Sequence, residues 1–222
     1  MIGCNLDRWA WLGTIAMAAA VGLTSARADI IVTTGMQPWE ICATCHSLNG
    51  ISAMARFPKL AGQRPAYIVK QVRDFRDGLR RNDGGQMEAT ASDISDDDLA
   101  RAAAYFGGLP APPPDGSVST DSEEWRRGAA LNQDGDPARG IASCRSCHED
   151  AEGSRLQGPF LKAQHAAYLA KQLRDWRSGE RTNDKSRAMP AIAAKLSEED
   201  IAAIAVFLAS QPRSRSETES AK

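Results

Sequence analysis

A short motif occurs twice in this chain of 222 residues, and its repetition limits the folds that the chain can adopt. Cys42-Ala-Thr-Cys45-His46 recurs as Cys144-Arg-Ser-Cys147-His148, an offset of 102 residues. The similarity extends beyond the motif, because Tyr67-Ile-Val-Lys-Gln-Val-Arg-Asp-Phe75 matches Tyr168-Leu-Ala-Lys-Gln-Leu-Arg-Asp-Trp176. Two copies at so long a period indicate duplicated domains, since solenoids use shorter and more numerous repeats.

The repeat and the composition along the chain divide it into five segments. Residues 29–109 and 123–212 are the two predicted domains, here named copy one and copy two. The stretch 110–122 begins with four prolines in five residues and continues with Gly, Ser and Asp, which is typical of a linker. Residues 213–222 are polar without periodicity, so we expect a disordered tail.

Residues 1–28 have the pattern of an export signal. The apolar stretch Trp9–Leu23 follows Arg8 and precedes Ala26-Arg27-Ala28, which is an A-x-A cleavage signature. We therefore expect cleavage before Asp29 and a periplasmic mature protein. The alternative is an uncleaved anchor, because Asp7 offsets Arg8. The apolar stretch is, however, shorter than the roughly 20 residues that span a bilayer.

Both copies show helical periodicity. Ile68, Val72 and Phe75 fall at i, i+4 and i+7, as do their counterparts in copy two, so each set forms one apolar stripe on a helix. Ser95 with Asp98, and the matching Ser197 with Asp200, place a capping hydroxyl and an acid at a helix start. The predicted fold class is all-α, with two tandem domains joined by the Pro-rich linker.

The copies differ in their leading helix. Residues 123–131 predict such a helix in copy two, whereas only 13 residues separate Asp29 from Cys42, with Pro38 among them. We expect the leading helix of copy one to be shortened or missing.

Composition narrows the function classes. The formal charge of −1 gives no basic excess to neutralise phosphates, so a nucleic-acid partner is not expected. Aromatic residues make up only 6% of the chain, so something other than large side chains is expected to fill the interior. A bound cofactor would do so.

Cys-x-x-Cys-His is the attachment signal of c-type haem. In this interpretation Cys42 and Cys45 form thioethers to one haem and Cys144 and Cys147 to a second. His46 and His148 would bind the two irons. Met87 and Met189 each lie 41 residues after the histidine of their copy, which favours them as the second axial ligands. The sequence predicts two covalently bound haem c groups with His/Met ligation.

Other interpretations of the cysteines are weaker. Four cysteines in an exported chain are typical of two disulfides, and Cys-x-x-Cys pairs also bind structural zinc or act as redox dithiols. The histidine next to each cysteine pair argues against disulfides. The export signal argues against a zinc ribbon, and the absence of a βαβ pattern in the sequence argues against a thioredoxin-like dithiol.

Three further positions carry specific expectations. A metal-bound imidazole needs an acceptor for its second nitrogen, and Pro58 and Pro159, 12 and 11 residues after the two histidines, could offer carbonyl oxygens, although each could be an ordinary loop proline. Met54 has no counterpart in copy two and is expected to fill the core. His165 aligns with Arg64, so we expect it at the surface or between the domains rather than on a metal.

Several motifs together resemble the di-haem class I cytochromes c of the cytochrome c4 type, over nearly all of residues 41–208. Besides the two attachment signals they are Phe57-Pro-Lys-Leu-Ala-Gly-Gln63, Gln164-His-Ala-Ala-Tyr168 with Lys171-Gln172, Glu180-Arg-Thr-Asn183-Asp184, and Ala193-Ala-Lys-Leu-Ser197. The resemblance implies two cytochrome c folds related by a pseudo-twofold axis, inter-haem electron transfer, and electron donation to terminal oxidases. The chain departs from the family pattern in its short leading helix, in Ala163 where copy one has Gly62, and in Glu88 after Met87.

The predicted function is a soluble electron carrier rather than an enzyme. The expected partners are redox proteins, either a membrane oxidase or a dehydrogenase, with peripheral docking on a membrane complex left open. One rival is the cytochrome subunit of a periplasmic dehydrogenase complex, such as a flavocytochrome that oxidises sulfide. Another is an enzyme such as a di-haem peroxidase or a thiosulfate dehydrogenase, which would need an open iron position or a fifth mature cysteine.

Overall fold

The computed structural model describes residues 35–149 and 158–213, which belong to one compact unit of the chain. The predicted signal at 1–28, its cleavage before Asp29 and the tail beyond 213 lie outside the described residues. Regular structure in the described part is helical, apart from two isolated β-bridges, and the predicted all-α class is confirmed. None of the helices in these ranges is long and apolar enough to cross a membrane.

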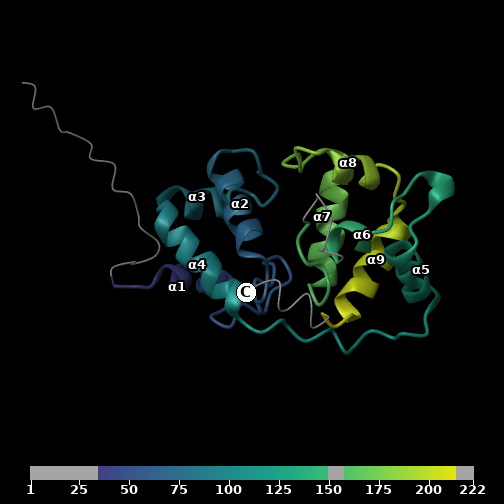
Figure 1. The fold of residues 1–222 in the computed structure, drawn as a ribbon, viewed down its shortest axis with the longest axis horizontal. Helices are drawn as coiled ribbons and strands as arrows, with labels where there is room; N and C mark the ends of the chain where they lie inside the picture. The colour runs from purple at the N-terminus through teal and green to yellow at the C-terminus, as the bar shows by residue number, and fades with distance from the viewer. Residues whose placement is uncertain (1–34, 150–157, 214–222) are drawn as a thin grey trace, which may run out of the picture. The chain divides into compact units, whose positions relative to one another are not determined.

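Each copy contributes a matching series of helices (Figure 1). Copy one contains α1 (Pro38–His46), α2 (Pro65–Arg76), α3 (Gln86–Asp93) and α4 (Asp96–Gly108). Copy two contains α5 (Glu123–Gln133), a 3₁₀ turn (Pro137–Arg139), α6 (Arg145–His148), α7 (Ala166–Ser178), α8 (Ala188–Ala193) and α9 (Glu198–Ser210). In both copies the last helix packs against the leading helix and the central one, so α4 contacts α1 and α2 as α9 contacts α5 and α7.

The last helix of each copy begins as predicted. Ser95 Oγ accepts a hydrogen bond from the Asp98 amide at 3.1 Å, and Ser197 Oγ accepts one from the Asp200 amide at 3.2 Å. The Asp200 carboxylate also accepts from the Ser197 amide, which completes a capping box in copy two. The apolar faces of these helices are buried: Leu99, Ala102, Ala103 and Phe106 in α4, and Ile201, Ile204, Ala205 and Leu208 in α9.

The leading helix of copy one is shortened rather than missing. Helix α1 has nine residues and ends on the attachment motif itself, whereas α5 has eleven and ends before a separate loop and α6. Trp39 of α1 stacks on Tyr105 of α4 with ring centroids 4.8 Å apart, and Trp125 of α5 meets Phe207 of α9 edge-on at 5.1 Å. An aromatic pair therefore fastens the leading helix to the last one in both copies.

Two glutamines join the copies through backbone groups. Gln63 Oε1 accepts from the Phe160 amide and its Nε2 donates to the Phe160 carbonyl, both at 3.0 Å. Gln164 pairs in the same way with the Lys59 amide at 2.9 Å and the Lys59 carbonyl at 3.0 Å. Each side chain thus satisfies both backbone polar groups of a buried residue in the other copy.

Three expectations concern residues that have no matching partner in the other copy. His165 lies between the copies, with Nε2 3.0 Å from the Ser52 carbonyl oxygen, as expected. Met54 is 51% exposed, so the expectation that it fills the core is wrong. Arg213, the first residue of the predicted tail, donates through Nη1 to the carbonyls of Gly62 at 2.6 Å and Ala61 at 3.2 Å, and the rest of that tail lies outside the described residues.

Candidate functional site

A cavity of about 980 Å³ brings together the residues that the sequence singled out. This volume is at the upper end of the range for ligand pockets. Apolar side chains of the central and last helices, such as Phe75, Phe106, Trp176 and Leu208, form much of its wall. Its lining also includes, from both copies, Cys42, Cys45, His46, Met87, Cys144, Cys147, His148 and Met189.

The two histidines are held by the carbonyls of the two prolines. His46 Nδ1 lies 2.8 Å from the Pro58 oxygen, and His148 Nδ1 lies 2.8 Å from the Pro159 oxygen. A carbonyl can only accept, so Nδ1 carries the proton and Nε2 keeps a free lone pair. Burial lowers the pKa of both imidazoles, which keeps them neutral. Both rings are therefore prepared to bind a metal through Nε2.

Cys42 and Cys144 are partly buried, whereas Cys45 is exposed. Within the described residues, Cys42, Cys45, Cys144 and Cys147 form no disulfide. Burial raises the pKa of Cys42 and of Cys144 to about 11, so these sulfurs remain thiols at neutral pH. In the described part of the chain no three His, Cys, Asp or Glu side chains converge as a metal cluster would require.

An aspartate holds the backbone at each methionine, which the sequence reasoning missed. Asp83 Oδ2 accepts from the Met87 amide at 2.6 Å, and Asp184 Oδ2 accepts from the Met189 amide at 2.8 Å. The available signal was the matched Asn-Asp pair that precedes both methionines. It gives no indication by itself of what the aspartates bind.

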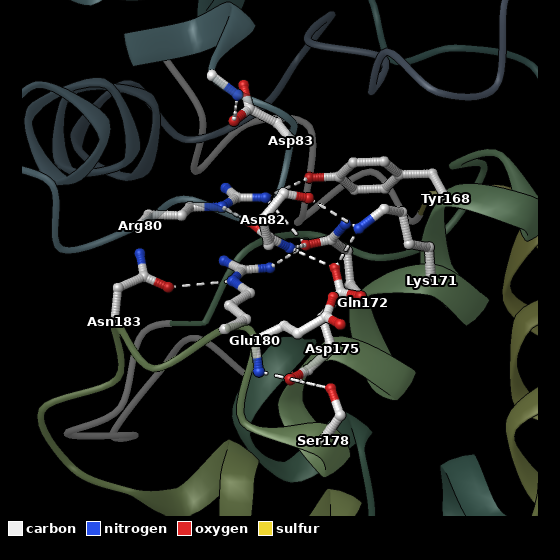
Figure 2. Close-up of polar contacts among 12 residues, drawn as sticks. Arg80, Asn82, Asp83, Tyr168, Lys171, Gln172, Asp175, Ser178, Glu180 and Asn183 are labelled. Atoms are coloured by element: carbon white, nitrogen blue, oxygen red, sulfur yellow. Dashed lines mark hydrogen bonds and ion pairs between the residues drawn. The ribbon is translucent and has the colours of Figure 1, made fainter.

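Two buried arginines, Arg80 (Figure 2) and Arg181, meet where the copies join, and these too were missed. Arg80 and Arg181 are each 5% exposed and pair as an isolated antiparallel bridge. Arg80 donates to oxygens of Gln71 at 2.7 Å, Gln172 at 2.9 Å and Tyr168 at 3.1 Å, all of them neutral groups. Arg181 has the matching set of bonds.

These arginines also line the cavity, which bears on what the cavity can hold. A buried cation surrounded by neutral acceptors favours an anion nearby. Haem carries carboxylates at one edge and an apolar ring. The thiol pairs, the prepared imidazoles, the thioethers, the apolar walls and the buried guanidinium groups therefore fit haem.

Comparison with known proteins agrees with this chemistry. A family model described as "Cytochrome C oxidase, cbb3-type, subunit III" matches residues 32–106 and 123–208, one match for each copy. Cytochrome c4 of Pseudomonas aeruginosa is 39% identical over 199 residues, which cover 87% of this chain and 96% of that protein. The chain belongs to the cytochrome c4 family.

Two further relatives extend the comparison. Reduced recombinant cytochrome c4 from Pseudomonas stutzeri superposes with a TM-score of 0.65 at 35% identity, covering 77% of this chain and 93% of that one. A thiosulfate dehydrogenase electron acceptor from Thiomonas intermedia is 33% identical over 188 residues, or 82% of this chain and 83% of that protein. As a member of the cytochrome c4 family, this chain is a di-haem electron-transfer protein with two haem c groups, and it is an electron carrier rather than an enzyme.

Proposed function

We propose that Cys42 and Cys45 attach the first haem and Cys144 and Cys147 attach the second. His46 with Met87, and His148 with Met189, are the axial ligands in this assignment. When bound, haem supplies a one-electron couple, and Met/His ligation raises its potential. The observation that carries the proposal is the repeated geometry: in both copies a proline carbonyl orients the histidine, and the methionine lies on the same cavity.

The proposed domains are residues 29–109 and 123–212, joined by the linker 110–122. Helix α4 ends at Gly108 and α5 begins at Glu123, which supports both boundaries. Part of the linker is nevertheless fastened to copy two, because the Asp115 amide donates to the Ala209 carbonyl at 2.8 Å.

The chain exchanges electrons with redox proteins. We propose that this exchange takes place in the periplasm, because a cleaved export signal would deliver the chain there. A dehydrogenase is the proposed donor and a membrane oxidase the proposed acceptor. The name of the Thiomonas relative supports a dehydrogenase donor. A permanent subunit of a dehydrogenase complex is the second candidate, and co-purification of a larger subunit with this chain at constant stoichiometry would favour it over a free carrier.

Mass spectrometry and spectroscopy test the haem assignment. The mature protein should begin at Asp29 and carry two added haem masses. The weak near-red band of thioether-to-ferric-iron charge transfer should fall by about half in Met87→Ala and in Met189→Ala. Met54→Ala is the control, since that exposed side chain should not affect the band. A single haem, or an unchanged band in either ligand variant, would contradict the assignment.

A further inference from the structure

The segment that precedes Met87 is held by a helix of the opposite copy. Lys171 Nζ donates to the Asn82 carbonyl oxygen at 2.7 Å, and Asn82 Nδ2 donates to Gln172 Oε1 at 3.0 Å. Arg80 Nη2 donates to the same Gln172 oxygen at 2.9 Å. Lys171 and Gln172 lie on α7, so all of these hydrogen bonds join the copy-one segment to copy two (Figure 2).

The reverse set of contacts exists on the other side. Lys70 Nζ donates to the Asn183 carbonyl oxygen at 2.8 Å, and Asn183 Nδ2 donates to Gln71 Oε1 at 3.0 Å. Arg181 Nη2 donates to Gln71 Oε1 at 3.0 Å. Since Lys70 and Gln71 lie on α2, copy one holds the segment that precedes Met189.

A carboxylate on the helix of each lysine binds both that lysine and the asparagine of the opposite copy. Asp175 accepts hydrogen bonds from Lys171 and Asn82, and Asp74 accepts from Lys70 and Asn183. Asp175 and Asp74 are 5% and 7% exposed, so the carboxylate end of each contact is shielded from solvent. Burial of the carboxylates makes these bonds less subject to screening than surface ion pairs are.

The anchored asparagine is directly followed by the aspartate that binds the methionine amide. Asp83 accepts from Met87 N at 2.6 Å and from Gly85 N at 3.1 Å. Asp184 accepts from Met189 N at 2.8 Å and from Ser186 N at 2.9 Å. The path from the opposite copy to each methionine therefore consists of two hydrogen-bonded steps through adjacent residues.

We propose that Lys171 is a positioning residue for Met87, and that Lys70 is a positioning residue for Met189. The proposal rests on the ligand roles proposed for the two methionines. Each methionine lies in the first turn of a short helix, Met87 in α3 and Met189 in α8, directly after its anchored segment. Occupancy of the neutral thioether ligand therefore depends on how much conformational entropy that segment has already lost. Because the anchor belongs to the other copy, methionine ligation in each domain depends on contact with its partner domain.

The test uses variants in which one methionine alone gives the near-red band. In a Met189→Ala background the band reports Met87, and in a Met87→Ala background it reports Met189. Lys171→Met and Lys70→Met remove the donor and keep most of the length of the apolar stem. These lysine side chains are 48% and 44% exposed, so neither change opens the core.

We expect a crossed result. With Met189→Ala, the Lys171→Met change should raise the equilibrium constant for loss of the Met87 band in mild denaturant by about threefold to tenfold, the effect of one partly exposed charged hydrogen bond. Lys70→Met should leave that constant within about twofold. With Met87→Ala the two lysines should exchange roles, and Lys171→Arg should restore the wild-type constant for Met87.

Other patterns contradict the proposal. Equal effects of both lysines on both bands would indicate a merely structural role in holding the copies together. An effect confined to the lysine's own copy, or no effect, would overturn the crossed positioning. If Met87→Ala and Met189→Ala themselves leave the band unchanged, the ligand assignment fails instead.

Discussion

Ala163 adopts the same left-handed backbone conformation as Gly62, its counterpart in copy one, with φ of +60° against +64°. Both residues donate their amide to the last helix, Gly62 to the Phe106 carbonyl at 2.8 Å and Ala163 to the Leu208 carbonyl at 2.9 Å. The turn therefore keeps its shape in copy two although the residue there has a Cβ atom. Left-handed backbone costs an alanine about 1–2 kcal/mol.

Exchanging these two residues should give unequal results. Ala163→Gly removes the strain, but it also removes a fully buried methyl and adds freedom to the unfolded chain, so we expect a net change in unfolding free energy below about 0.5 kcal/mol. Gly62→Ala should lower the unfolding free energy by about 1–2 kcal/mol. The alanine would be strained in the left-handed conformation, and its Cβ would lie 3.2 Å from the Leu109 oxygen. Urea unfolding of the holoprotein measures both. Equal and opposite shifts would contradict this account.

Gly158 determines how closely the chain approaches the second histidine. A Cβ at this position would lie 2.6 Å from His148 Nδ1 and 2.7 Å from Cε1. Gly158→Ala should therefore displace the imidazole from the Pro159 carbonyl and weaken ligation of the second iron. We expect the fraction of holoprotein in which both haems are low-spin to fall about tenfold, which is the effect of losing a hydrogen bond that orients a metal ligand. The control is Gly116→Ala, whose Cβ meets nothing within 4 Å, and a similar loss there would refute the explanation.

Asp200 joins three segments of copy two from a fully buried position. Its carboxylate binds Arg127 of α5 at 2.8 Å, Arg139 of the 3₁₀ turn at 2.7 Å and the Ser197 amide at 2.9 Å. Burial alone would raise the pKa of Asp200, but the bonds from Arg139, Ser197 and Arg127 hold it well below its usual range.

Asp200→Asn should lower the unfolding free energy at pH 7 by about 2 kcal/mol, less than for a fully buried pair because both arginines are partly exposed. The folded-state pKa is depressed, so this stabilisation is present above the unfolded pKa of about 4 and is lost as pH falls through the folded value. The advantage of wild type over the variant should shrink below about pH 4 in denaturant titrations. Asp98→Asn, at the exposed counterpart, is the control and should change stability by less than about 0.5 kcal/mol at either pH.

Copy one should lose its methionine ligand first. Among the described residues, the apolar cluster of copy two has ten buried members and that of copy one has three. Met189 is followed by Pro190, which restricts the backbone, whereas Met87 is followed by Glu88. The more solvated haem should also have the lower potential, since burial disfavours ferric charge. Redox titration of Met87→Ala and Met189→Ala assigns each potential, and a higher potential in copy one would refute this order.

Local patterns in the sequence were sufficient for the helices and their starts. Ser95 and Ser197 cap as their spacing predicted, since capping depends on residues within one turn. The leading helix of copy one was predicted short, but its merging with the attachment motif was not. Met54 was misjudged, because an apolar residue without a repeat counterpart has no periodicity that would place it.

The contacts between copies could not be predicted in the same way. Lys171 and Asn82 are 89 residues apart in sequence, and Arg80 and Gln172 are 92 apart. A matched residue in both copies is compatible with a role inside each domain or across the pair, so the repeat alone does not separate these cases. The haem attachment residues could be proposed from the sequence because their motif is contiguous and the chemistry of its residue types is specific.

The reciprocal glutamine pairs have a consequence for the history of the gene. Before duplication, one ancestral domain had to satisfy its own peptide groups or leave them to water. Gln63 now binds the backbone groups of Phe160, and Gln164 binds those of Lys59. Both residues directly follow the prolines whose carbonyls orient the histidines. A descendant protein that lost either copy would leave the backbone groups of Phe160 or Lys59 without their glutamine partner, directly beside the proline that orients a histidine. The duplication is in this sense a one-way step, because neither copy can be lost without leaving backbone groups of the other without their glutamine partner.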